Sequence, residues 1–107
     1  MDKSALGLLK KMVDIDVYEL DGKPTTCVNA RWCDLQNFRC ETGLDKSEYF
    51  RLIFDLNELD LIYILQHADN GKLKIKMIVT DKGIKLLKER EKAAEYVRLP
   101  FNDIVFD

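Results

Sequence analysis

Apolar positions along the chain change from helical to strand spacing and back, and this pattern predicts the order of the elements. A short helix is expected from Ser4 onward, followed by a β-hairpin over residues 14–29. Asp21-Gly22 separates the two strand-like runs of this hairpin, and both residues tolerate the positive φ of a tight turn. Asn29 is then expected to cap a helix over residues 30–40.

The second half of the chain predicts two more helices around a second hairpin. Asp45 is expected to cap a helix over residues 46–59, and the segment 62–79 reads as two strands joined by an Asn-Gly turn. Thr80 is expected to cap a last helix. The inner face of that helix is expected to carry Ile84, Leu87, Ala94 and Val97. The apolar tail 97–107 should pack on the domain itself or on a second subunit.

The returning strand of the second hairpin alternates lysine with apolar residues. Because strand side chains point to opposite faces in turn, Lys72, Lys74 and Lys76 should share one face. The net charge of the chain is −2, yet residues 72–92 hold eight basic and three acidic residues. Lys82, Lys85 and Lys88 are expected to extend this patch along the last helix. Such a patch favours phosphate or an acidic protein surface as its target.

Length and composition indicate one soluble globular domain over residues 1–107. No repeat or linker divides the chain, and 34% of it is charged. No apolar run approaches the ~18 residues of a membrane span, and the first residues lack the pattern of a signal peptide. We therefore expect a cytoplasmic protein without a membrane partner.

The cysteines and the single histidine leave two alternatives. Cys27, Cys33 and Cys40 lack C-x-x-C spacing, although with His67 they make four possible metal ligands. We favour reduced thiols, with Cys33 and Cys40 facing the core as small apolar groups, and expect no metal and no cofactor. Because no nucleophile, phosphate-loop or zinc-hydrolase motif is found, an enzyme is not expected.

Two segments resemble the winged helix-turn-helix superfamily, including MarR-like and PadR-like small regulators and phage-borne winged-helix proteins. "LNELDLIYIL" is similar to the end of a recognition helix that enters the wing, with Asp60 where the family usually has glycine. "MIVTDKGIKLL" resembles the strand-to-helix closure of that family. The resemblance implies an α+β fold, a winged helix-turn-helix with a three-helix core, a β-hairpin wing and a C-terminal helix.

In DNA-binding members, the recognition helix enters the major groove and the wing contacts the backbone. Carried over by resemblance, the nucleic-acid contacts are Lys46, Ser47 and Arg51 of the recognition helix and Lys72, Lys74 and Lys76 of the wing. Residues 45–60 nevertheless hold five acidic and two basic residues. Arg51 and Asp55 also have the i,i+4 spacing of a surface ion pair, which we expect to form.

Two hypotheses follow from these residues. The first is a DNA-binding transcriptional regulator that uses the basic wing on double-stranded DNA, as a homodimer through residues 82–107. The second is a protein-interaction module, such as a phage or mobile-element protein that inhibits a host nucleic-acid machine. That module would bind its protein partner through the acidic, aromatic helix 45–59, with Phe54, Asp55 and Glu58 as contacts.

Overall fold

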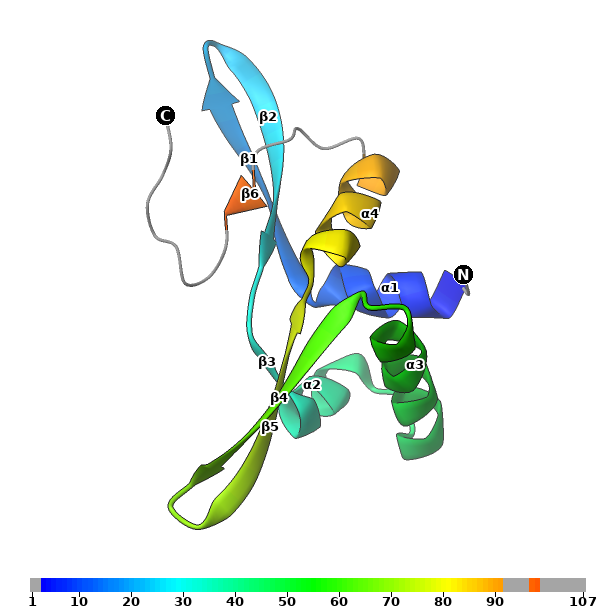
Figure 1. The fold of residues 1–107 in the computed structure, drawn as a ribbon. Coiled ribbons are helices and arrows are strands. Elements are labelled where there is room, and N and C mark those ends of the chain that lie inside the picture. Colours follow the sequence, from blue (N-terminus) through cyan, green and yellow to red (C-terminus); the bar gives the residue numbers. More distant parts are fainter. Residues whose placement is uncertain (1–2, 92–96, 99–107) are drawn as a thin grey trace.

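The computed structural model describes residues 3–91 and 97–98 of the chain, and this part is α+β. Four helices and two three-stranded sheets follow one another in the order drawn in Figure 1. The elements are α1 (Lys3–Lys11), β1 (Val13–Leu20), β2 (Lys23–Ala30), β3 (Cys33–Asp34), α2 (Leu35–Thr42), α3 (Lys46–Glu58), β4 (Ile62–Asp69), β5 (Lys72–Val79), α4 (Asp81–Glu91) and β6 (Val97–Arg98).

Both predicted hairpins are confirmed, and they extend toward opposite ends of the molecule (Figure 1). The first sheet has the order β1-β2-β6, with β1 and β2 antiparallel and β6 parallel to β2. The second has the order β3-β5-β4, so the two-residue strand β3 joins the second hairpin on the β5 side. The turns at Asp21-Gly22 and Asn70-Gly71 have positive φ at both residues.

The core lies where α1, α3 and α4 meet the inner ends of the two hairpins. Tyr49 of α3 is fully buried, and its hydroxyl donates a hydrogen bond of 2.7 Å to the Leu35 carbonyl at the start of α2. The rings of Phe38 and Tyr49 pack at 6.4 Å, which joins the two helices across their three-residue turn. The other members of the core are mostly aliphatic, among them Leu9, Met12, Leu52, Leu56, Met77 and Leu87.

The predicted helix cap at Asn29 is wrong. Strand β2 continues to Ala30, and the Asn29 side chain donates to the Asp16 carboxylate at 2.7 Å. Asp34 caps α2 instead, because its carboxylate accepts the backbone N–H groups of Gln36 and Asn37 at 3.1 and 3.0 Å. The helix therefore begins five residues later than predicted.

The structure also corrects the prediction for the cysteines. Cys33 is buried as expected, but in strand β3 rather than in a helix, and Cys40 is exposed rather than core-facing. Leu35 and Phe38 form the buried face of α2, and Cys40 lies off that face. Among the described residues, no group of three or more possible ligands could hold a metal ion.

The predicted caps of the last two helices are confirmed. The Asp45 carboxylate accepts the Glu48 backbone N–H at 2.9 Å, and the Thr80 hydroxyl accepts that of Gly83 at 3.2 Å. The inner face of α4 carries buried Ile84 and Leu87 as predicted. Val97, which was expected on the same helix, lies instead in β6 opposite Val28, whereas Ala94 and the tail 99–107 lie outside the described residues.

Candidate nucleic-acid interface

The two-residue turn at Asn70-Gly71 sets the register of the hairpin β4–β5 and brings together the predicted lysines. Asp69 pairs with Lys72, His67 with Lys74, and Leu65 with Lys76. Residues directly opposite each other in an antiparallel pair project from the same face of the sheet. One face of this hairpin therefore carries Lys72, Lys74 and Lys76 of β5 with Tyr63, Leu65 and His67 of β4, and we call it the basic face.

The β4 members of this face were not predicted as site residues from the sequence. The Tyr63 and Leu65 side chains are 53% and 38% exposed. The register needed to find them was present in the sequence, because a two-residue Asn-Gly turn fixes which residues lie opposite each other. Aromatic side chains beside basic groups are a feature of surfaces that bind single-stranded nucleic acid, because unpaired bases stack on the aromatic rings.

One carboxylate interrupts the basic face. Lys74 forms an ion pair with Asp69 at 3.2 Å, and both side chains are about half exposed, at 47% and 48%. Ion pairs at this exposure contribute about 0–1 kcal/mol, since solvent screens them. Lys74 can therefore exchange Asp69 for a stronger anionic partner at small cost.

Helix α3 presents a different electrostatic environment. The Arg51 guanidinium lies between two carboxylates, 2.7 Å from Glu48 and 3.4 Å from Asp55, so the predicted pair with Asp55 is confirmed. Lys46 and Ser47 are exposed in the first turn, directly after the capping carboxylate of Asp45. The predicted contacts of α3 thus lie among acidic groups that repel phosphate.

The outer surface of α3 also carries an uncovered aromatic side chain. Phe54 is 64% exposed, beside Asp55 and one turn before exposed Glu58. Phe50, one turn earlier, packs instead against Tyr49 with ring centroids 5.4 Å apart. The residues proposed for protein binding therefore share one accessible helix surface.

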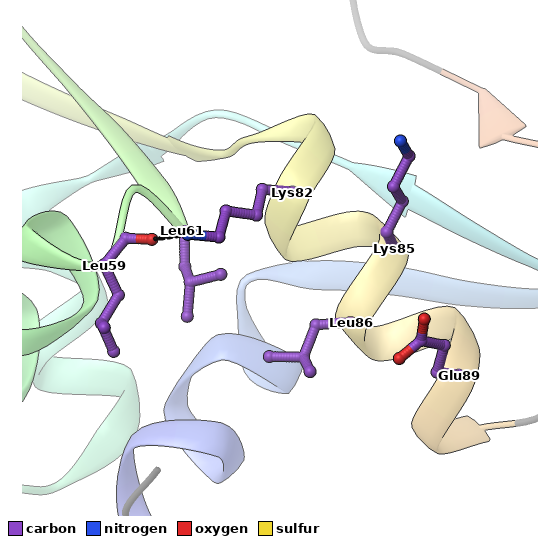
Figure 2. Close-up of a pocket in the computed structure, with 6 residues that line it drawn as sticks. All are labelled: Leu59, Leu61, Lys82, Lys85, Leu86 and Glu89. Atoms are coloured by element: carbon purple, nitrogen blue, oxygen red, sulfur yellow. Dashed lines mark hydrogen bonds between the residues drawn. The ribbon is translucent and has the colours of Figure 1, made fainter.

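The lysines of α4 do not continue the basic face, because α4 lies at the opposite end of β5 from the hairpin turn (Figure 1). The Lys82 ammonium group donates to the Leu59 carbonyl at 2.9 Å, where it stabilises the C-terminal end of α3 (Figure 2). Lys82 and Lys85 line a groove of about 340 Å³ with Leu59, Leu61, Leu86 and Glu89. This groove is separate from the basic face.

Two buried groups near the second hairpin have shifted acidities. Burial raises the pKa of Tyr49 above its ordinary value of 10.0, and nearby Cys33 and Asp34 act in the same direction. Burial also raises the pKa of the Cys33 thiol above 9.0, against the opposing charge of Arg31. Both groups are held in their neutral forms, which suits a structural role in the core.

Comparison with known proteins adds no relative to this description: no family model matches the chain, and neither a curated protein nor a solved structure is significantly similar to it. Within the described residues, no helix is both long and apolar enough to cross a membrane. The basic face and the outer surface of α3 are therefore the features of the chain that bear on its function.

Proposed function

We propose that this chain is a DNA-binding transcriptional regulator of the winged-helix type that holds duplex phosphates with the basic face of β4–β5. The observation that carries the proposal is the row of Lys72, Lys74 and Lys76 on one side of a projecting hairpin. Neighbouring lysines in this row lie about 7 Å apart along the strand. Duplex DNA presents one negative charge per ~1.7 Å of its axis, so the row matches several phosphates at once.

The order of elements supports the winged-helix assignment. A short strand, two helices joined by a three-residue turn and a hairpin follow one another, and β3 pairs with β5 of that hairpin. This is the order of elements that the sequence resemblance implies. In this arrangement α2 and α3 form the helix-turn-helix and β4–β5 form the wing.

Both segments that carry the resemblance have a physical explanation. Asp60 has a φ of 58°, the left-handed conformation for which glycine is the usual choice. A Cβ atom on Gly83 would lie 2.5 Å from the Leu61 carbonyl oxygen, so only glycine lets α4 approach the residue before β4 this closely. The Thr80 hydroxyl, which caps α4, also donates to the Asp60 carbonyl at 2.6 Å. The two segments thus form one connected joint at the inner end of the wing.

The charge on α3 determines how such a regulator would bind. Because Arg51 is already held by Glu48 and Asp55, a guanine contact from it would require breaking both ion pairs. Lys46 and Ser47 remain exposed for phosphate contacts at the start of the helix. We therefore expect affinity to come mainly from the wing, to fall steeply with salt and to depend weakly on sequence.

The test is fluorescence anisotropy of a labelled mixed-sequence duplex at two salt concentrations. Replacement of Lys72, Lys74 and Lys76 by Glu is expected to lower affinity about 100-fold or more, since three phosphate contacts become repulsive. The charge-matched control replaces exposed Lys3, Lys23 and Lys85, all outside the wing, and should bind within about twofold of wild type. Equal loss in both triple variants, or no binding by wild type at low salt, would contradict the proposal.

A second candidate, the protein-interaction module, is favoured by the 64% exposure of Phe54 within an acidic surface. Aromatic side chains that become buried commonly dominate the energy of protein interfaces. If α3 is the contact, Phe54→Ala or Arg51→Ala should release a protein partner that the triple lysine variant still binds. If the wing is the contact, Phe54→Ala should leave duplex affinity unchanged.

A further inference from the structure

The two long sheet edges of the described structure differ in their protection against pairing with another chain. Strand β1 ends the sheet β1-β2-β6, and β4 ends the sheet β3-β5-β4. Strand β1 carries three carboxylates, on Asp14, Asp16 and Glu19. Charged side chains on an edge strand are a common means of preventing edge-to-edge association. The edge formed by β1 is therefore protected.

Strand β4 has none of this protection. Residues 62–68, IYILQHA, contain no lysine, arginine, aspartate, glutamate or proline, and the first acidic residue is Asp69 at the turn. Among the described residues, no strand pairs with β4 on the side away from β5. The outer half of its hairpin extends beyond α2 and α3 (Figure 1), and Tyr63, Leu65, Gln66 and Ala68 along β4 are exposed. An open, uncharged edge of this length is a template for strand addition.

We infer that the edge of β4 pairs antiparallel with β4 of a second copy of this chain and forms a continuous six-stranded sheet. The uncharged run 62–68 is centred on Leu65, so a twofold axis at Leu65 pairs the run entirely with itself. In this register Leu65 lies opposite its own copy, Tyr63 opposite His67 and Ile64 opposite Gln66. The pairing covers Tyr63 and Leu65, which are 53% and 38% exposed in the single chain.

Electrostatics permits this pairing although β5 is basic. The lysine rows of the two copies would be separated by three strand spacings, about 14 Å, which exceeds the Debye length at physiological salt. The like charges on β5 therefore repel weakly across the new interface. A pairing of β1 with its own copy would, by contrast, bring carboxylates of the two strands together.

The other edge of the same sheet explains why the association should stop at two copies. That edge is β3, which has only two residues and leads directly into α2. The edge of β4 is therefore the one long edge of this sheet in the described structure. Once two copies pair through it, no long edge of the sheet is left to bind a third copy, so the assembly is closed. The expected product is a dimer rather than a filament, with two basic faces in one sheet.

The test is sedimentation equilibrium of the full chain without nucleic acid, which keeps the result independent of the proposed function. Wild type is expected at twice the 12.5 kDa of one chain. Leu65→Glu places like charges opposite each other at the twofold axis and should weaken the dimer at least tenfold. Within each chain the new carboxylate lies opposite Lys76, so the fold of the single chain should tolerate it. The matched control is Leu73→Glu on β5, at a side chain that is 66% exposed on the other face, and it should remain dimeric.

Disulfide trapping provides a second measurement that does not depend on the stability of the Glu variant. In a background where exposed Cys40 is replaced by Ser, Leu65→Cys should form a covalent dimer under mild oxidation, and Leu73→Cys should not. Opposite residues of an antiparallel pair have Cα atoms about 4.5–5.5 Å apart, within the range that a disulfide spans. Wild type sedimenting at 12.5 kDa, or Leu65→Glu remaining a full dimer, would overturn the inference.

Discussion

The two hairpins of this protein are nearly identical in backbone design and opposite in charge. Each has two eight-residue strands and a two-residue turn, with φ of 51° and 74° in the first and 52° and 77° in the second. The hairpin β1–β2 carries four acidic residues and one lysine, whereas β4–β5 carries one acidic residue and three lysines. They extend to opposite ends of the molecule (Figure 1).

Under the proposed function, side chains rather than backbone geometry separate the roles of the two hairpins. The acidic hairpin repels nucleic acid, and its edge carboxylates discourage pairing with other strands. The basic hairpin attracts phosphate and leaves its edge uncharged. The two hairpins are also anchored differently. Arg31, directly after β2, pairs with Asp14 of β1 at 3.5 Å and donates to the Lys11 carbonyl of α1 at 2.7 Å, which joins the first hairpin to α1. The second hairpin is joined to α4 through the hydrogen bond between Gly83 and Thr80.

The largest expected effect comes from disturbing the anchor of the basic hairpin. Gly83→Ala would place a Cβ atom 2.5 Å from the Leu61 carbonyl oxygen and the Val79 side chain, at a cost of about 1–3 kcal/mol in the free energy of unfolding. Gly7→Ala is the control, because no atom lies within 4 Å of the added Cβ, and it should stabilise α1 by about 0.5–1 kcal/mol. Urea denaturation measures the free energy of unfolding of both variants. If Gly83→Ala is as stable as wild type, the close approach of α4 at this position is not needed.

The next effect is a loss of folding stability at alkaline pH, and it comes from two buried groups near the basic hairpin. The pKa values of Cys33 and Tyr49 are raised by burial, so the folded state keeps protons that the unfolded state releases. Stability from these groups is full below their ordinary values of 9.0 and 10.0 and is lost as pH rises above them. The melting temperature should fall above about pH 9.

Tyr49→Phe separates the two contributions to this alkaline loss. The substitution removes the hydrogen bond to the Leu35 carbonyl and should cost about 1–2 kcal/mol at neutral pH. Because Phe does not ionise, the loss of stability above pH ~10 should become smaller in this variant. An unchanged pH profile would mean that Tyr49 does not contribute to the alkaline transition.

A paired substitution compares the turns of the two hairpins directly. Gly22→Ala and Gly71→Ala each force a left-handed conformation on a residue with a Cβ atom, at a cost of about 1–2 kcal/mol. Neither added Cβ meets an atom within 4 Å, so the cost is backbone strain alone. The two stability losses should match in urea denaturation, but only Gly71→Ala should weaken duplex binding. Equal weakening by both variants would remove the distinction between the hairpins.

The smallest effect sharpens the contrast in charge. Asp69→Asn removes the carboxylate that pairs with Lys74 and should strengthen duplex binding about two- to threefold at low salt. Glu19→Gln makes the same charge change on the acidic hairpin, at an exposed position, and should leave the affinity unchanged. Anisotropy titrations of the two variants side by side provide the measurement. A larger gain in affinity from Glu19→Gln would indicate that the acidic hairpin lies closer to the duplex, which would contradict the proposal.

The two hairpins could be predicted from the sequence because a tight turn and the alternation of strand residues are each encoded within a few neighbouring residues. Asp21-Gly22 and Asn70-Gly71 each specify a turn without help from distant contacts. The helix caps at Asp45 and Thr80 could be predicted for the same reason, because each side chain bonds to a backbone N–H only three residues later. The site lysines could be placed on one face for the same reason.

Features that depend on distant contacts were not predictable from local pattern. Asn29 is a good cap in isolation, but its amide bonds to Asp16 across the hairpin and leaves Asp34 to begin α2. Strand β3 has two residues, too few to produce a periodic pattern, and it is defined by pairing with Met77 and Lys76. Val97 was assigned to a helix by its spacing and lies in β6 because it pairs with Val28.

The most direct test of the central contrast is the salt dependence of duplex binding in single lysine variants. Each phosphate contact contributes about 0.9 to the slope of log affinity against log salt concentration, counted per protomer. Lys72→Gln, Lys74→Gln and Lys76→Gln should each lower that slope by about this amount, while Lys3→Gln and Lys23→Gln should leave it unchanged. A slope that is the same in all five variants would contradict the assignment of phosphate binding to the basic hairpin.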